Sequence, residues 1–387
     1  MPIHDFDRIL DRRGGDSIKW NLYPENVLPM WVAESDFTAP EPIVTALQKR
    51  VAEGVYGYSD PLDKEFQQAV THWMRSRFSF EAKDEWVCFS PGVVITLMLC
   101  VLAYTKEGDN VVFLTPTYGP FYNLPKAHGR TPLGSPLLRE GPGQYTIDFA
   151  DLEAKLAKKN STLMFLCNPH NPTGKVFCHA DLMRIGELCL KHGVLVVSDE
   201  VHSDYVHPGK QHVPFSGLSD AIAQNSLMAM NPSKTFNIAD LQCSAVISAN
   251  SDLLAQFKAM VQRHFLSSNT LGKIALKTAY RECAWYADQV AAYVKGNIDM
   301  AVAFINERVG KISAYAPEST YLLWLDCREM GLAQKDLEDF FMQKARIALN
   351  SGTNFGEEGT GFMRMNLACP RATVQEAMNR LEKASRA

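Results

Sequence analysis

The stretch NPSKTFN, residues 231–237, contains the lysine on which the interpretation of this chain depends. Two polar stretches precede it, NPHNPTG from residue 168 and DEVH from residue 199. Asn171 lies 28 residues before Asp199, and Asp199 lies 35 residues before Lys234. These spacings let each group sit at the end of a different strand of one α/β sheet, where such sheets bind ligands. The three stretches therefore predict a single ligand site.

The residue types in these stretches fit the chemistry of pyridoxal phosphate (PLP). An amine must form a Schiff base with the aldehyde of this cofactor, and Lys234 is the candidate if its ammonium loses a proton easily. A carboxylate keeps the pyridine nitrogen protonated, and Asp199 fits this role. Asn171 would donate to the phenolate oxygen, and His202 would support the same oxygen or the ring edge. PLP is therefore the predicted cofactor, and no metal is expected.

Residues 86–105 carry no charge, which raises the question of a membrane helix. A bilayer helix needs roughly 20 predominantly apolar residues, and Pro91 with Gly92 interrupts this run near its start. We expect a buried helix that begins just after Gly92, with the free amides of Val93 and Val94 bound to the cofactor phosphate. For this run alone, a core helix without a ligand is the alternative.

Short apolar runs alternate with helical stretches along the chain. Strands are expected at residues 110–114, 162–166, 193–198 and 244–247, and this alternation is typical of a doubly wound α/β sheet. After about residue 289, a long helical stretch, a strand at residues 320–325 and a final helix from Thr373 indicate a smaller domain.

Six motifs follow one another in order: LPMWVAESDF from residue 28, YGY from 56, SPGVV from 90, TPTYGPF from 115, residues 232–241, and GFMRMNLACPR from 361. They resemble motifs of the fold-type I PLP enzymes, and within these the MalY/PatB branch of cystathionine β-lyases (cysteine C–S lyases). The resemblance spans nearly the whole chain. It implies a PLP-dependent transferase-like α/β fold with two domains. The large domain, residues 30–288, would hold a mostly parallel doubly wound sheet, and residues 1–29 and 289–387 would form a smaller α/β domain.

The same resemblance implies roles for further residues. Tyr118 would stack on the pyridine ring, and Arg364 would bind the substrate carboxylate with both arms of its guanidinium group. Taken alone, Tyr118 could be a core aromatic and Arg364 a structural ion-pair partner. Trp31 and Tyr122 are expected on the substrate side near the entrance. Tyr58 would reach the phosphate in the site of a second subunit, so a homodimer is expected.

Three positions depart from the family pattern, and a fourth differs from the classical transaminases. Asn231 stands where a phosphate-binding serine is usual, close to Ser233, and an amide can still donate a hydrogen bond. Asp240 replaces a glycine, and a carboxylate there would repel the phosphate unless it turns outward. Ser35 replaces a methionine on the expected substrate side. Gln242 stands where classical transaminases tend to place an arginine against the phosphate, which leans modestly away from transamination.

The predicted reaction is α,β-elimination from L-cystathionine or related L-cysteine S-conjugates. Lys234 would remove the α-proton, and the products would be pyruvate, ammonia and a thiol. Two alternatives stay open. An aminotransferase shares the fold and all the cofactor groups, and a MalY-like regulatory protein would act through protein contact.

Bulk composition agrees with an ordinary globular enzyme. The chain has 387 residues, of which 46% are hydrophobic and 21% are charged. A net charge of −4 argues against nucleic-acid binding. Nine cysteines without a Cys-x-x-Cys pair indicate free thiols in a reducing compartment, and the charged N-terminus lacks an apolar signal core. A cytoplasmic location without membrane attachment is therefore expected.

Overall fold

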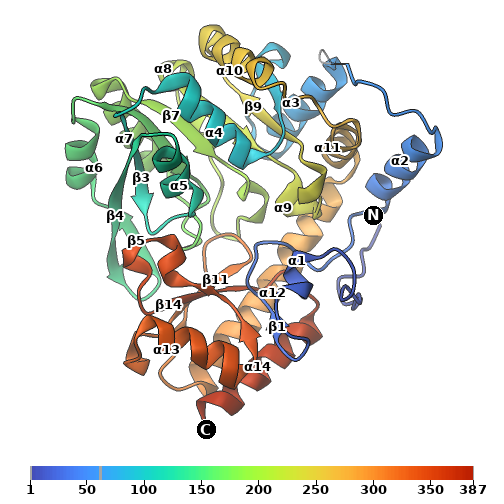
Figure 1. Ribbon diagram of the computed structural model, residues 1–387, viewed down its shortest axis with the longest axis vertical. Helices are drawn as coiled ribbons and strands as arrows, with labels where there is room; N and C mark the ends of the chain where they lie inside the picture. Colours follow the sequence, from blue (N-terminus) through green and yellow to red (C-terminus); the bar gives the residue numbers. More distant parts are fainter. Residues whose placement is uncertain (1, 61–62, 387) are drawn as a thin grey trace.

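In the computed structural model, which describes residues 2–60 and 63–386, helices cover a large central sheet and a smaller sheet lies beneath it (Figure 1). The large sheet has the strand order β2-β9-β8-β7-β6-β3-β4-β5. The four pairs from β8 to β4 are parallel, whereas β2–β9, β9–β8 and β4–β5 are antiparallel. The strands are β2 (Val87–Ser90), β3 (Asn110–Thr115), β4 (Thr131–Gly141), β5 (Gln144–Ile147), β6 (Ser161–Cys167), β7 (Leu195–Asp199), β8 (Ser226–Met230) and β9 (Ser244–Ile247).

Apolar residues occupy both faces of the central strands, which explains their continuous hydrophobic runs. In β6, Leu163 and Phe165 pack into one core cluster with helix α4 (Val93–Tyr104), and Met164 and Leu166 pack into another with α7 (His179–His192). Alternate side chains of a strand point to opposite faces, so one strand can supply both clusters. The predicted doubly wound sheet is confirmed.

The remaining helices divide between the two sheets. Around the large sheet lie α2 (Glu41–Ala52), α3 (Lys64–Phe78), α5 (Pro120–Ala127), α6 (Phe149–Leu156), α8 (Asp220–Gln224), α9 (Ser233–Phe236), α10 (Ser251–Arg263) and α11 (Thr270–Glu282). Helix α12 (Ala284–Arg308) runs from this region down to the smaller sheet, where α13 (Gln334–Asp339) and α14 (Arg371–Ser385) lie (Figure 1). No helix within the described ranges is both long and apolar enough to cross a membrane.

The smaller sheet is antiparallel and has the strand order β10-β11-β14-β13. Its strands are β10 (Ser313–Ala314), β11 (Leu322–Asp326), β13 (Asn350–Ser351) and β14 (Phe362–Asn366). Near the N-terminus, after the short helix α1 (Ile18–Asn21), strand β1 (Leu28–Pro29) pairs in parallel with β12 (Ile347–Ala348). Strand β1 thus lies against a strand from the last quarter of the chain, while the two domains and their limits stay a prediction.

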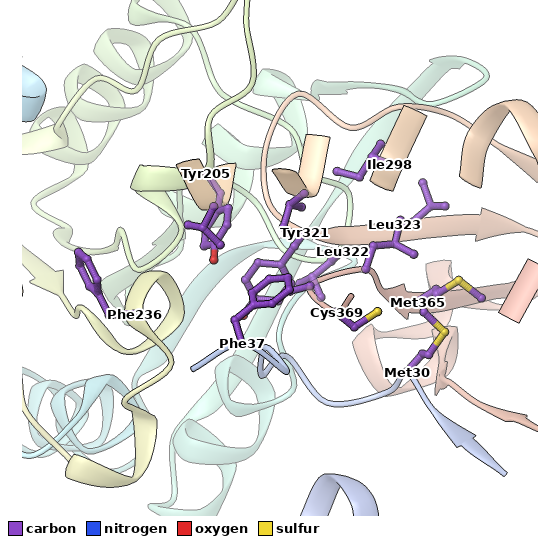
Figure 2. Packing of buried hydrophobic residues seen from close by; sticks show 14 of the residues in the cluster. Met30, Phe37, Tyr205, Phe236, Ile298, Tyr321, Leu322, Leu323, Met365 and Cys369 are labelled. Atoms are coloured by element: carbon purple, nitrogen blue, oxygen red, sulfur yellow. The ribbon is translucent and has the colours of Figure 1, made fainter. Parts of the chain in front are cut away.

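One hydrophobic cluster joins the N-terminal segment to the C-terminal region. It contains Met30 and Phe37 from the first segment together with Tyr321, Leu322 and Met365 from the smaller sheet and its approach (Figure 2). All of these residues are at most 3% exposed. The segment between Met30 and Phe37 is therefore fixed at both ends by burial of apolar surface.

A buried ion pair also holds the segment between Met30 and Phe37 in place. The ammonium of Lys19 in α1 lies 2.8 Å from one carboxylate oxygen of Asp36 and donates to the carbonyl of Glu34 at 3.1 Å. The other Asp36 oxygen accepts from Trp20 Nε1 at 2.8 Å and from Arg12 at 3.2 Å. Lys19 is 1% exposed and Asp36 4%. Each charge is thus buried with a partner, as buried charges require.

Replacing one member of this pair should destabilise the protein strongly. In Asp36→Ala the Lys19 ammonium stays buried without its counter-charge, and we expect a loss of about 3–5 kcal/mol in the free energy of unfolding. The matched control is Asp299→Ala, which breaks an exposed pair with Lys295 one turn away on α12 and should cost less than about 1 kcal/mol. Chemical unfolding followed by tryptophan fluorescence measures both. Equal losses in the two variants would contradict the role given to Asp36.

Candidate active site

A cavity of about 1020 Å³ opens where the large sheet meets the smaller one. Lys234, Asp199, Asn171, His202, Tyr118, Arg364, Asn231, Ser233, Gly92, Val93 and Val94 all line it. Asp199 is the last residue of β7, Asn171 follows β6, and Lys234 lies in α9 directly after β8. These three strands are neighbours in the sheet and run parallel. Their carboxyl ends therefore bring together residues that lie far apart in the sequence.

The amine of Lys234 lies deep in the cavity and donates to the carbonyl of Ala33 at 2.8 Å. Burial lowers the pKa of Lys234 to about 8, and the positive charge of Arg364 adds to this effect. The negative charge of Asp199 opposes it. A substantial fraction of the amine is therefore unprotonated and nucleophilic near neutral pH.

Asp199 and His202 are buried next to this lysine. Burial raises the pKa of Asp199 to about 7, although the amide of Val201 donates to its carboxylate at 3.3 Å and Lys234 favours the ionised form. Burial lowers the pKa of His202 to about 3, so its ring is neutral. Its Nδ1 atom is buried and has no hydrogen-bond partner among the described residues. Asp199 is thus suited to a positively charged group, which would stabilise its ionised form.

The N-terminus of α4 opens into the cavity next to the turn that carries the lysine. Gly92 caps this helix with a φ of +109°, a conformation that glycine adopts readily, and the helix runs from Val93 to Tyr104 as expected. The amide of Gly92 donates to the hydroxyl of Ser244 at 3.1 Å. An open helix N-terminus presents free N–H groups to an anion.

The residues beside Lys234 complete this end of the cavity. Asn231 accepts hydrogen bonds from the amide of Ser233, at 2.8 Å, and from its hydroxyl, so its carbonyl oxygen fixes the turn and its NH₂ group is the donor that it can offer a ligand. Gln242 lines the same cavity. Asp240 is exposed and does not line the cavity. Its carboxylate therefore turns outward and does not point at the expected phosphate position.

Arg364, in β14, lies at the other end of the cavity and is 3% exposed. Its Nη1 donates to Asn171 Oδ1 at 3.0 Å and its Nη2 donates to the carbonyl of Trp31 at 3.0 Å. The guanidinium group lies 4.8 Å from the ring centre of Phe355. Its Nε is buried without a partner among the described residues. A buried cation with an unused donor is suited to a carboxylate ligand.

Two residues expected on the substrate side, Trp31 and Ser35, do not line the cavity. Trp31 does not line the cavity with its side chain, whose Nε1 donates to the carbonyl of Lys19 at 3.2 Å; its backbone carbonyl supports Arg364 instead. Ser35 is 2% exposed and is likewise absent from the lining. Tyr58 is fully exposed and lies at a separate cavity with Arg50 and Lys273.

Comparisons with known proteins agree with this geometry. Residues 27–381 match the family described as aminotransferase class I and II. Cystathionine beta-lyase PatB of Bacillus subtilis is 42% identical over 98% of this chain and 99% of its own. Protein MalY of Escherichia coli is 32% identical over the full length of both chains. The chain belongs to this family, in its MalY/PatB branch.

A solved structure of the same fold confirms the predicted architecture. Cystalysin from Treponema denticola, which contains a pyridoxal 5'-phosphate cofactor, superimposes with a TM-score of 0.95 and is 34% identical over 99% of both chains. The PLP-dependent transferase-like fold and the resemblance to the MalY/PatB branch are therefore confirmed.

Several cavity residues of this MalY/PatB family member were not expected from its motifs. They belong to α5, to β13 and to the loop after β13: Asn123, Asn350, Thr353, Asn354, Phe355, Glu357 and Thr360. Tyr122, expected near the entrance, also lines the cavity. The carbonyl of Ala33, which accepts from Lys234 and from Tyr321 Oη at 3.0 Å, is a backbone atom and has no side-chain signal. Sequence motifs identify the residues that carry the chemistry, whereas the positions of these other cavity residues are known only from the fold.

The low pKa of Lys234 predicts an unusual pH dependence for its reaction with an aldehyde. In cofactor-free protein, the rate of covalent attachment of PLP should rise with pH and level off above about pH 8, because only the unprotonated amine attacks. Absorbance at a series of pH values measures this rate. Nα-acetyl-lysine is the control. Changes in the protonation of PLP affect its reaction in the same way, but its own amine has an ordinary pKa of about 10.4.

Arg364→Leu provides a second check, because it removes a neighbouring positive charge that lowers the pKa of Lys234. The midpoint for this variant should move above that of the unchanged protein. A rate profile for the unchanged protein that coincides with that of acetyl-lysine would contradict the environment described for Lys234.

Proposed function

We propose that this chain is a PLP-dependent carbon–sulfur β-lyase that converts L-cystathionine or related L-cysteine S-conjugates to pyruvate, ammonia and a thiol. The observation that carries the proposal is the meeting of three buried groups in one cavity: the Lys234 amine, the Asp199 carboxylate and the Arg364 guanidinium group. The name of PatB, at 42% identity over nearly the whole chain, supports the same reaction.

The residues fit PLP as the cofactor. The N-terminus of α4 and the turn with Ser233 would hold its phosphate, Asp199 would pair with its pyridine nitrogen, and Lys234 would bind its aldehyde carbon. His202 has a ring nitrogen that no other described residue bonds and that could bind a polar atom of the cofactor. When bound, PLP withdraws electrons from the α-carbon of an amino acid and so makes the α-proton acidic.

The protein's own groups would orient the substrate and move its proton. Arg364 would bind the α-carboxylate, because its Nε is a buried donor without a partner among the described residues and its two Nη groups are fixed by Asn171 and Trp31. Lys234, with its lowered pKa, would accept the α-proton as a general base. The bond between the β-carbon and sulfur would then break with its electron pair on sulfur, which takes up a proton to leave as the thiol. Water would hydrolyse the remaining unsaturated amine to pyruvate and ammonia.

Pyruvate release tests this function directly. The PLP-loaded protein should produce pyruvate continuously from L-cystathionine with no 2-oxo acid present, as followed by a coupled lactate dehydrogenase assay. Lys234→Ala should lower turnover by at least about 1,000-fold, because the variant loses both the nucleophile and the base. Its circular dichroism spectrum should remain that of the unchanged protein.

Two results would count against the β-lyase. Stoichiometric conversion of the cofactor to its amine form without pyruvate would indicate an aminotransferase, which the family description also includes. Turnover by Lys234→Ala close to that of the unchanged protein would remove the lysine from the mechanism.

We also propose a homodimer in which Tyr58 reaches the phosphate of the other subunit's cofactor. Val55, Tyr56 and Tyr58 form a run of exposed large apolar side chains, and such a surface is typical of protein contacts. The free state of all nine cysteines, with Cys178 exposed, supports a location in the reducing cytoplasm.

Mixing two variants that are each impaired at limiting PLP tests the shared site. Tyr58→Ala should bind PLP about tenfold more weakly, because a hydrogen bond to a charged phosphate is lost. Dimers mixed from Tyr58→Ala and Lys234→Ala subunits contain one site with both residues intact. At limiting PLP, random mixing should therefore recover about a quarter of the normal activity. If Tyr58 acts within its own chain, every mixed site is defective and no activity returns.

A further inference from the structure

The part of the cavity beyond Arg364 has a wall of polar side chains. Asn123 comes from α5, and Thr353, Asn354, Glu357 and Thr360 come from the loop between β13 and β14. The family motifs that hold the cofactor include none of them. If Arg364 binds the α-carboxylate and Lys234 lies at the α-carbon, the space beside this wall is available to the group on sulfur.

This wall is built onto the large sheet and is not a loose loop. The carbonyl of Phe355 accepts from the amide of Thr117 at 2.7 Å and from Tyr122 Oη at 3.2 Å. The carboxylate of Glu358 accepts from Thr115 Oγ1 at 2.7 Å. Gly356 has a φ of +118°, and a Cβ atom there would lie 2.3 Å from the Tyr122 hydroxyl. The loop that carries Glu357 is therefore held in one place by contacts of both its backbone and its side chains.

Electrostatics distinguishes this wall from the rest of the cavity. Among the described residues that line the cavity, the cationic side chains are Lys234 and Arg364, and the proposed reaction uses both. His202 is neutral, because burial lowers its pKa to about 3. Glu357 is the one acidic residue of the wall, and its carboxylate forms no hydrogen bond or ion pair with another described residue. It is therefore available to a ligand.

We propose that Glu357 selects the leaving group: the enzyme prefers L-cysteine S-conjugates whose thiol part carries an ammonium group, and disfavours those whose thiol part carries only a carboxylate. This inference rests on the proposed β-lyase function and names its substrate class. An ammonium group would be attracted to the Glu357 carboxylate and could be hydrogen-bonded by Asn123 and Asn354. A carboxylate at the same place would meet a like charge, and apart from Lys234 and Arg364 no lysine or arginine among the described lining residues could offset it.

Three substrates of similar size test the preference. They are S-(2-aminoethyl)-L-cysteine, with a terminal ammonium group, S-carboxymethyl-L-cysteine, with a terminal carboxylate, and S-ethyl-L-cysteine as the neutral reference. We expect kcat/KM for pyruvate release to be at least about tenfold higher for the aminoethyl than for the carboxymethyl substrate at low salt. The ratio should fall as salt is added, because Glu357 is exposed at the cavity mouth.

Glu357→Gln should reduce this ratio about fivefold or more, since it removes the charge and keeps the shape of the side chain. Glu358→Gln is the matched control, because it removes the neighbouring negative charge from a side chain that does not line the cavity. The control should retain the preference. Values for each variant are compared with its own S-ethyl-L-cysteine value, which separates the charge effect from a general loss of active protein.

Binding of unreactive analogues keeps the test independent of turnover. L-Lysine, L-2-aminoadipate and L-norleucine have the shapes of the three substrates with carbon in place of sulfur, and calorimetry on the PLP-loaded protein gives their dissociation constants. Tighter binding of L-lysine than of L-2-aminoadipate supports the inference if the difference is lost in Glu357→Gln. This holds even if no substrate yields pyruvate, because the absence of pyruvate would refute only the proposed lyase reaction. Equal binding, or a preference unchanged by Glu357→Gln, overturns the inference even if pyruvate is released.

Discussion

The backbone carbonyl groups of residues 31–34 accept hydrogen bonds from the side chains on which the active site depends. Ala33 accepts from Lys234 and Tyr321, Trp31 accepts from Arg364, and Val32 and Glu34 both accept from Asn366 Nδ2 at 2.6 Å. Lys234 lies in α9, which follows strand β8 of the large sheet, whereas the other donors lie in the smaller sheet or next to it. A displacement of this one segment would therefore move the amine and the guanidinium group together, which is why the buried pair beneath it matters for geometry as well as for stability.

The cavity is electrostatically poised for a ligand that carries both signs of charge. Burial raises the pKa of Asp199 and lowers the pKa values of Lys234 and Arg364, so each of these groups is less stable as an ion than it would be in water. A positive nitrogen beside Asp199 and a carboxylate beside Arg364 would each restore the ionised form. Ligand binding can thus recover free energy that folding has stored in unfavourable desolvation.

Local sequence patterns were sufficient to predict the parts of the site that lie at strand ends. Lys234, Asp199 and Asn171 each follow an apolar run of strand length, so their meeting at one sheet edge follows from the α/β pattern. Strand β4 was not expected, because Pro132 and Pro136 interrupt its pattern and it lies toward the edge of the sheet, where proline is tolerated.

Contacts between distant segments were beyond the reach of local pattern. Trp31 was predicted to bind the substrate because of its place in a motif. Its ring instead packs against Tyr23, and its backbone carbonyl accepts a hydrogen bond from Arg364. Glu357 lies in a loop whose position depends on pairing between β13 and β14 and on docking against Thr117. Such positions are set by tertiary packing, which no single stretch of sequence records.

The hydrogen bonds of β14 also govern the order in which the site can be assembled during synthesis. The strands that carry Asp199 and Lys234 to the sheet edge are all made by the end of β9, whereas Arg364 and Asn366 lie in β14, which follows much later in the sequence. A nascent chain that has not yet reached β14 lacks the side chains that bond the carbonyl groups of residues 31 and 32, although those residues were made first. The substrate end of the cavity can therefore form only after β14 has been synthesised.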